Sequence, residues 1–287
     1  MSDPPDRQTL LADLVERWEL ELGEQLSGDD SGPSTATWTA TRAGAEPVVL
    51  RVGDPGEWFA QEVRSLLQWD GNGAVLLIDH DPRGAVLLER AVPGTSLLDE
   101  PDEDRAMLLA ADLLERLWVP GPDGVDTVAD EVRRWADTLP ERNRASGGPI
   151  DEELIDEANG LLRELAPSQR EAVLLHGDLH LGNVLAAQRE PWLAIDPKPL
   201  VGEREFDVTA LIRDRQEELV ADVDAGRERV QHRFDLLSER LACDRERLRG
   251  WSVAIMVDYA LWCFETDDRE WGINQIATAR MLQDLRT

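Results

Sequence analysis

The apolar residues of the first 90 positions follow helical and strand-like patterns in turn. A three- and four-residue spacing predicts an amphipathic first helix, carried by Leu10, Leu11, Leu14, Val15, Trp18 and Leu22. Short β-branched or alternating runs predict strands at residues 35–41, 47–53, 74–80 and 85–90. A second helical pattern covers residues 57–69, between the second and third of these strands.

From residue 102 onward the pattern becomes helical. Helices are predicted at residues 104–118, 125–139, 152–165 and 251–264, and the charge-alternating run 227–249 predicts a solvated surface segment. Strands before helices indicate an α+β protein with a small N-terminal lobe, 1–90, built on an antiparallel sheet. The larger, mostly helical C-terminal lobe would be 91–287. The breaker-rich segment Glu89 to Pro93 is interpreted as the hinge between the two lobes, although a simple connector has the same pattern.

The charge balance is strongly acidic, with 59 acidic and 30 basic residues and a net charge of −29. Such a field repels nucleic acid and anionic membranes and attracts cationic ligands, although a solubility- or salt-adapted surface also explains it. Lys198 is the only lysine. No apolar run approaches the roughly 20 residues of a membrane span, and the start MSDPPDRQTL has no signal-peptide pattern. A cytoplasmic protein is therefore expected.

The stretch LLHGDLHLGNVLAAQREPWLAID, residues 174–196, carries the main candidate chemistry. Asp178 precedes Asn183 by five positions, and a predicted strand then leads to Asp196. Two carboxylates and an amide in this order are typical of phosphoryl transfer, where one acid meets the acceptor hydroxyl and the other two groups hold magnesium. A metal hydrolase using His176 and His180 is an alternative, and so is a purely structural turn capped by Asp178.

The N-terminal region contains candidate nucleotide-binding groups. Arg51 in a strand and Glu62 in the following helix match the cation and carboxylate pair with which kinases hold phosphates, although an ordinary ion pair has the same residues. The small residues Gly28, Gly32 and Pro33 precede a strand and could cover phosphates, although a plain loop has the same composition. The predicted hinge, with Glu89 and Ala91, would offer backbone groups to adenine.

The segments HGDLHLGNVL and REPWLAIDPKPLVGEREFD resemble the aminoglycoside phosphotransferase branch of the protein-kinase-like fold, most closely the streptomycin 6-kinase and hydroxyurea phosphotransferase family. The resemblance implies that Asp178 is the catalytic aspartate and that Asn183 and Asp196 bind Mg²⁺. It places Arg51 where the family usually has a nucleotide-binding lysine. Asp207 is similar to the aspartate that braces the catalytic loop, and the nucleotide would be ATP or GTP.

A protein kinase is not expected. Gly177 stands where protein kinases carry an Arg that couples to a phosphorylated activation loop, and only ten residues, Pro197 to Phe206, separate Asp196 from Asp207. The acceptor should therefore be a small molecule. Because the C-terminal helices line the acceptor pocket in related aminoglycoside kinases, the candidates for gripping a cationic acceptor are Asp258, Trp262 and Glu265. An ordinary core helix with an acidic end is the alternative.

The sequence as a whole predicts an ATP- and Mg²⁺-dependent O-phosphotransferase that inactivates an aminoglycoside in the manner of a streptomycin 6-kinase. It indicates no obligate protein partner. One alternative keeps the chemistry and changes the acceptor to a sugar, an amino sugar or another metabolite. Another is a catalytically silent nucleotide-binding protein, which the Arg51 substitution would favour and the intact Asp178, Asn183 and Asp196 oppose.

Overall fold

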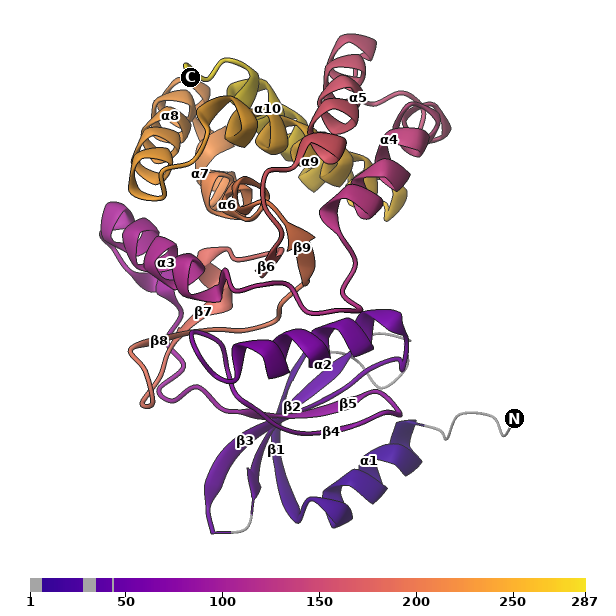
Figure 1. The fold of residues 1–287 in the computed structure, drawn as a ribbon, viewed down its shortest axis with the longest axis vertical. Coiled ribbons are helices and arrows are strands. Elements are labelled where there is room, and N and C mark those ends of the chain that lie inside the picture. The colour runs from indigo at the N-terminus through magenta and orange to yellow at the C-terminus, as the bar shows by residue number, and fades with distance from the viewer. Residues whose placement is uncertain (1–6, 28–34, 43) are drawn as a thin grey trace. The chain divides into compact units, whose positions relative to one another are not determined.

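A computed structural model describes residues 7–27, 35–42 and 44–287 (Figure 1). The chain forms two compact units. The first contains the described residues up to Thr95 together with Pro122–Val125 and Leu185–Ile195, and the second contains Ser96–Gly121, Asp126–Val184 and Asp196–Thr287. The proposed phosphate loop with Gly28, Gly32 and Pro33 lies outside the described residues.

The first unit is built on a five-stranded antiparallel sheet in the order β1-β2-β3-β5-β4. Its strands are β1 (Leu20–Ser27), β2 (Ala36–Arg42), β3 (Glu46–Val52), β4 (Leu77–Asp81) and β5 (Ala85–Glu89). The four predicted strands are present, and the register of β3 on β5 pairs Val48 with Glu89 and Leu50 with Leu87. This sheet confirms the antiparallel N-terminal part of the predicted fold.

The first helix is shorter than predicted, and the strand after it was missed. Helix α1 (Arg7–Arg17) ends where the amide of Trp18 donates to the carbonyl of Leu14 and Glu19 adopts a left-handed conformation, with φ of 53°. Leu20 and Leu22 then lie in β1. The prediction failed because the four-residue step from Trp18 to Leu22 is compatible with a helix, while the alternation LEL is the strand pattern that the structure follows.

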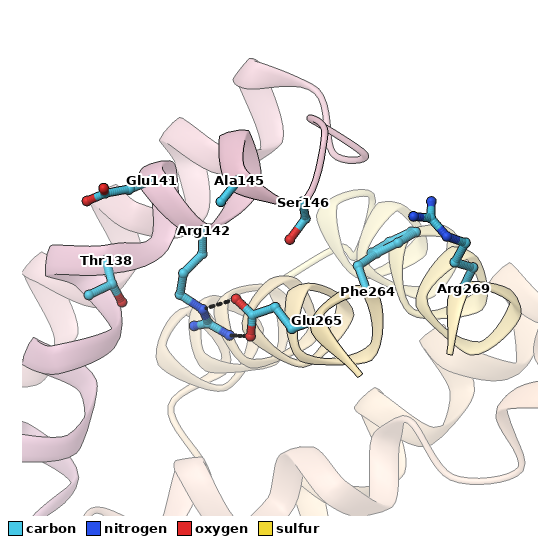
Figure 2. Close-up of a pocket in the computed structure, with 8 residues that line it drawn as sticks. All are labelled: Thr138, Glu141, Arg142, Ala145, Ser146, Phe264, Glu265 and Arg269. Carbon is cyan, nitrogen blue, oxygen red and sulfur yellow. Dashed lines mark hydrogen bonds and ion pairs between the residues drawn. The ribbon is translucent and has the colours of Figure 1, made fainter. Parts of the chain in front are cut away.

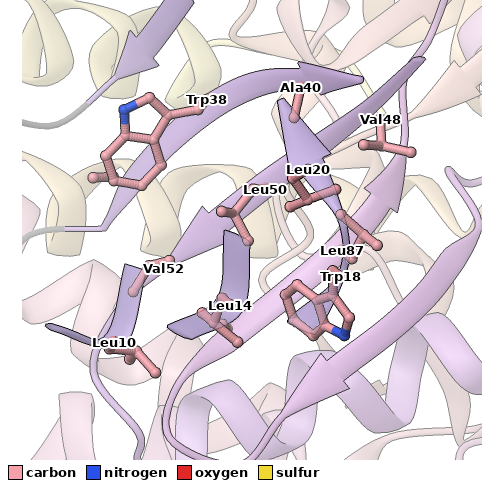
Figure 3. Packing of buried hydrophobic residues seen from close by; sticks show 12 residues of the cluster. Leu10, Leu14, Trp18, Leu20, Trp38, Ala40, Val48, Leu50, Val52 and Leu87 are labelled. Atoms are coloured by element: carbon pink, nitrogen blue, oxygen red, sulfur yellow. The ribbon is translucent and has the colours of Figure 1, made fainter. Parts of the chain in front are cut away.

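Helix α1 and one face of the sheet form the core of the first unit (Figure 3). Every second residue of β3, namely Val48, Leu50 and Val52, joins this cluster of buried side chains. Because side chains alternate between the two faces of a strand, Arg51 points to the opposite face. There it contacts Glu62 of helix α2 (Glu57–Trp69), the helix predicted at the same residues.

The second unit is mostly helical, which confirms the predicted C-terminal architecture. Its α-helices are α3 (Glu103–Leu117), α4 (Val128–Ala145), α5 (Glu152–Leu165), α6 (Arg204–Ile212), α7 (Gln216–Ala221), α8 (Val223–Arg240), α9 (Arg245–Glu265) and α10 (Arg269–Gln283). Within the described part of the chain, no helix is long and apolar enough to cross a membrane.

The charged run 227–249 is not the uniformly solvated segment that its composition predicted. It divides between α8 and α9, and Arg233 and Arg247 are both buried. The guanidinium of Arg247 lies 2.6 Å from the carboxylate of the fully buried Glu203, and that of Arg233 donates to the carbonyl of Ile212. The alternating charge pattern did not reveal that these two arginines are buried, because the groups that pair with them lie far away in the sequence.

Short strands flank the central stretch of the sequence. Strand β6 (Val173–Leu175) pairs antiparallel with β9 (Leu200–Gly202), with Leu174 opposite Val201. Strand β7 (Val184–Ala186) pairs with β8 (Trp192–Ala194), and the 3-10 turn Leu181–Asn183 precedes β7. The segment 176–183 is therefore the loop that connects one short strand, β6, to the next, β7.

Candidate active site

The loop that follows β6 is held by Asp207, a buried residue of α6. Its two carboxylate oxygens accept hydrogen bonds from the amides of Gly177, at 2.7 Å, and His176, at 3.0 Å. The indole of Trp118 donates to the same carboxylate at 3.0 Å. Burial raises the pKa of Asp207 to about 6 in spite of these donors. Asp207 thus fixes the backbone immediately before Asp178.

The close approach of Lys198 requires a glycine at position 177. Gly177 has a φ of +79°, and a Cβ atom there would lie 1.9 Å from the carbonyl oxygen of Lys198. The amide of Lys198 in turn donates to the carbonyl of His176 at 2.7 Å. The loop is therefore fixed to the segment after Asp196. The structure leaves no room at Gly177 for the Arg that protein kinases have at the corresponding position.

Three further contacts hold the backbone around Asp178 and Asn183. The carbonyl of Asp178 accepts from the side-chain amide of Asn183 and from the backbone amide of His180, both at 3.0 Å. The amide of Leu181 donates to the carboxylate of Asp214 at 2.5 Å. Since the nitrogen of the Asn183 amide is used in this way, its oxygen is the atom left to face a ligand.

The carboxylate of Asp178 is 28% exposed and pairs with the guanidinium of Arg213 at 2.8 Å. Arg213 also lies over the ring of Tyr259, 5.3 Å from its centre, and Tyr259 stacks on Trp262 with ring centres 5.4 Å apart. Neither Arg213 nor Tyr259 was among the residues predicted from the sequence. Arg213 is 35 residues from Asp178 and belongs to no motif, so no signal in the sequence pointed to it.

The two histidines of the loop have structural partners on the loop itself. The Nδ1 atom of His176 accepts from the amide of Asp178 at 3.3 Å, and that of His180 accepts from the amide of Gly182 at 3.1 Å. Among the described residues, no group of three or more His, Cys, Asp or Glu side chains is arranged to hold a metal ion. The loop therefore offers carboxylate and amide oxygens rather than imidazoles.

Asp196 lies in the left-handed region, with φ of 53°, and its carboxylate is 45% exposed. The ammonium of Lys198 lies 3.0 Å from one of its oxygens. An Asp carboxylate and the oxygen of Asn183 are hard donors of the kind that Mg²⁺ prefers, and Mg²⁺ in kinases takes its other ligands from water and phosphates. The donor set that this unit provides is therefore chemically suited to magnesium carried in with a nucleotide.

The predicted cation and carboxylate pair of the first unit is in contact. Arg51 of β3 and Glu62 of α2 form an ion pair in which both side chains are largely buried. In the predicted hinge, Glu89 is held by its own interactions: its amide donates to the carbonyl of Leu76, and its carboxylate pairs with Arg189 at 2.8 Å. Ala91 is buried just beyond the end of β5.

Two of the three candidate residues for acceptor binding, Asp258 and Glu265 of α9, are joined by an arginine. The guanidinium of Arg142 binds the carboxylate of Glu265 through two nitrogens, at 2.8 and 3.0 Å (Figure 2). It also donates to the carboxylate of Asp258. Burial raises the pKa of Asp258. Trp262 belongs to the same helix and stacks on Tyr259.

A cavity of about 530 Å³ opens next to this ion-paired cluster, in the second unit. Its lining residues come from α4 and from the junction of α9 and α10, and they are Thr138, Glu141, Arg142, Ala145, Ser146, Phe264, Glu265 and Arg269 (Figure 2). Of the three candidate acceptor residues, Glu265 lines this cavity, whereas Asp258 and Trp262 do not. The volume suits a small organic ligand.

Comparison with known proteins identifies the family. The family described as aminoglycoside/hydroxyurea antibiotic resistance kinase matches residues 19–267. The chain is 38% identical to a streptomycin 6-kinase of Streptomyces glaucescens, over 89% of this chain and 82% of that protein. It is 36% identical to a hydroxyurea phosphotransferase of Kitasatospora aureofaciens, over 95% of this chain and 77% of that protein.

The fold is also that of a solved kinase structure. The aminoglycoside phosphotransferase APH(4)-Ia matches with a TM-score of 0.64 and 19% identity, over 96% of this chain and 98% of that one. Together with the sequence matches, this confirms the protein-kinase-like fold that the resemblance implied. The chain belongs to the aminoglycoside/hydroxyurea antibiotic resistance kinase family.

Proposed function

We propose that this kinase transfers the γ-phosphoryl group of ATP to a hydroxyl of a cationic aminoglycoside, as a streptomycin 6-kinase does. The observation that carries the proposal is the similarity to a streptomycin 6-kinase over most of both chains. The braced loop around Asp178 supports it, because phosphoryl transfer depends on positioning and charge rather than on covalent chemistry. The reaction would take place in the cytoplasm, where ATP is available.

Asp178 would receive the acceptor. Arg213 holds one oxygen of its carboxylate, Oδ1, so that Oδ2 can accept a hydrogen bond from the acceptor hydroxyl. As the acceptor oxygen bonds to the γ-phosphorus, the bond from phosphorus to the bridging oxygen of ADP breaks and the hydroxyl proton passes to Asp178. Asn183 and Asp196 would hold Mg²⁺, whose charge offsets that of the phosphates.

The nucleotide would be held by the first unit. The largely buried ion pair of Arg51 and Glu62 holds a guanidinium that would bind phosphate oxygens in place of the more usual lysine, in a different geometry. The backbone of Glu89 and Ala91 would bind the purine. ATP is proposed over GTP because structures of the same fold, those of the aminoglycoside phosphotransferase APH(4)-Ia, were solved with ADP and with AMP-PNP.

Glu265, which lines the cavity, would attract a cationic group of the acceptor, while the reacting hydroxyl lies at Asp178. Glu265 and Asp258 bring two carboxylates to one arginine, so this cluster has an excess of negative charge. The net charge of −29 acts in the same direction and favours the approach of a cation. A polycationic aminoglycoside fits these charges better than a neutral sugar.

The test is the formation of ADP and of phosphorylated product with Mg²⁺, ATP and a panel of acceptors that includes streptomycin. Streptomycin should stimulate ADP release, and mass spectrometry should show one added phosphoryl group, placed at the 6-hydroxyl by NMR. Asp178→Asn should reduce turnover at least about 1,000-fold. Asp156→Asn, which removes the same charge from the exposed face of α5, is the matched control.

A second candidate acceptor is hydroxyurea, because one relative is a hydroxyurea phosphotransferase. Hydroxyurea is neutral and would gain nothing from the excess of negative charge in the cluster of Arg142, Asp258 and Glu265. The ratio of kcat/KM for streptomycin and hydroxyurea decides between the two. If no acceptor in the panel stimulates ADP release while ATP still binds, the proposal fails in favour of a silent nucleotide-binding protein.

A further inference from the structure

The only lysine of the chain lies next to a proposed magnesium ligand. Lys198 follows Asp196 by two residues, and its ammonium lies 3.0 Å from the Oδ1 atom of that carboxylate. All other side-chain cations of the chain, histidine aside, are arginines. Lysine offers a compact point charge on a flexible stem, which can exchange one anionic partner for another more freely than a planar guanidinium can.

The backbone of Lys198 is fixed to the loop of Asp178. Its amide donates to the carbonyl of His176, and its carbonyl packs so closely on Gly177 that a side chain there is impossible. The side chain is 39% exposed. Lys198 therefore combines a rigid backbone attachment to the residues just before Asp178 with an ammonium group that can move.

The ion pair with Asp196 conflicts with the proposed metal site. A divalent cation on this carboxylate would place two positive centres beside one negative group, and their repulsion at such short distance is strong. The electrostatic energy of the ammonium then becomes more favourable if it moves to another anion within reach of its side chain. When Mg²⁺ arrives with a nucleotide, that anion is the phosphate chain, and its outermost, most highly charged member is the γ-phosphate.

We propose that Lys198 is a further catalytic residue, which leaves Asp196 and binds the γ-phosphate when the Mg²⁺–nucleotide complex binds. In this position the ammonium offsets negative charge on the phosphoryl oxygens while the phosphorus passes from ADP to the acceptor. In the free protein the same ammonium neutralises Asp196. The inference rests on the proposed function, since it requires a nucleotide with a γ-phosphate.

The first test compares nucleotides with and without the γ-phosphate. Binding of ADP and of the non-hydrolysable analogue AMP-PNP is measured by calorimetry with Mg²⁺. Lys198→Met should weaken AMP-PNP binding about 10-fold or more, the effect of losing one charged hydrogen bond, and should change ADP binding less than about 2-fold. Lys198→Arg should restore part of the difference. Arg133→Met removes a charge that is 66% exposed on α4 and should change neither.

The second test uses the single lysine. An acyl-phosphate derivative of ATP transfers its acyl group to an amine near the phosphate: an amide bond forms, the acyl–oxygen bond breaks, and ATP leaves. Mass spectrometry should find the label on Lys198, and excess Mg²⁺–ATP should suppress it. The variant Arg133→Lys adds an exposed lysine as an internal reference, whose labelling should not change with ATP.

The outcomes separate this inference from the proposed function. If AMP-PNP binds to the wild type, and Lys198→Met weakens both nucleotides equally or neither, Lys198 has only a structural role and the inference is wrong while the function stands. Labelling of Lys198 that ATP does not suppress leads to the same conclusion. If the wild type binds neither nucleotide, the proposed function fails and the inference fails with it.

Discussion

The guanidinium of Arg213 lies 2.8 Å from the carboxylate of Asp178 and 5.3 Å from the ring centre of Tyr259. The guanidinium is held by the charge of the Asp178 carboxylate and by a cation–π contact with the ring of Tyr259. Tyr259 is in turn stacked on Trp262 of the same helix. Arg213 thus orients the side chain of Asp178, while Asp207 and Asn183 hold the backbone around it.

Arg213→Met should lower kcat about 10- to 100-fold with little change in the KM for ATP, because the acceptor-facing carboxylate loses its fixed orientation. Arg213→Lys should fall between this variant and the wild type, since a lysine keeps the charge and loses the planar contact with Tyr259. Steady-state kinetics with both substrates varied provide the measurement. An increase in the KM for ATP at constant kcat would contradict the positioning role.

The steric need for a glycine at position 177 can be tested by comparing Gly177 with Gly148, which has a similar backbone conformation. Gly177→Ala should destabilise the protein by more than about 2 kcal/mol and abolish activity, because the new methyl group meets the carbonyl of Lys198. Gly148 has a φ of +68°, and a methyl group added there would have nothing within 4 Å, so Gly148→Ala should cost only about 1 kcal/mol. Urea unfolding of both variants gives the comparison, and equal losses would disprove the steric argument.

Asp207 should make stability depend on pH. Its pKa in the folded protein is about 6, above the ordinary value of 3.8, so the fold favours the protonated carboxyl. The corresponding stabilisation is fully present below about pH 4 and is lost as the pH rises through about 6, a change of about 3 kcal/mol. In Asp207→Asn this dependence should be absent. The difference in unfolding free energy between wild type and variant, measured from pH 4 to 7, should therefore fall with rising pH; a constant difference would refute the assignment.

The ion pair of Arg51 and Glu62 should control nucleotide affinity. Arg51→Met should raise the KM for ATP about 10-fold or more, since it removes the proposed phosphate contact and leaves the Glu62 carboxylate buried without its cation. Arg51→Lys should preserve most of the affinity. The expected KM for streptomycin is unchanged in both variants. If Arg51→Met binds ATP normally, the pair is only structural.

Glu265 should distinguish charged from neutral acceptors. Glu265→Gln removes a negative charge from the cavity and should raise the KM for streptomycin about 3- to 10-fold. The KM for neutral hydroxyurea, where it is a substrate, should not change. Glu164→Gln, on the exposed face of α5, is the control for a change in net charge alone. An equal effect on both acceptors would show that Glu265 acts on the structure rather than on the acceptor's charge.

The sequence by itself determined the features that are local. Periodicity located strands β2 to β5 and helices α1 to α5 and α9, with α2 and α5 at their observed ends, because burial of one face imposes a period on neighbouring residues. The spacing of Asp178, Asn183 and Asp196 indicated the chemistry, since all three groups belong to one short continuous stretch. Between Trp18 and Leu22 the same residues fit both a helical and a strand period, so the local pattern was insufficient and β1 was missed.

Only the tertiary structure decided which distant side chains meet. Arg142 joins Asp258 and Glu265 across more than 110 residues, Arg213 reaches Asp178 across 35, and Glu203 buries its charge against Arg247 across 44. Nothing in the neighbourhood of these residues reveals the pairing, because a charge is stabilised in the interior by whatever partner the packing of helices brings to it. The protein's orienting contacts therefore emerge from helix packing, whereas its candidate catalytic groups lie in one continuous stretch of sequence.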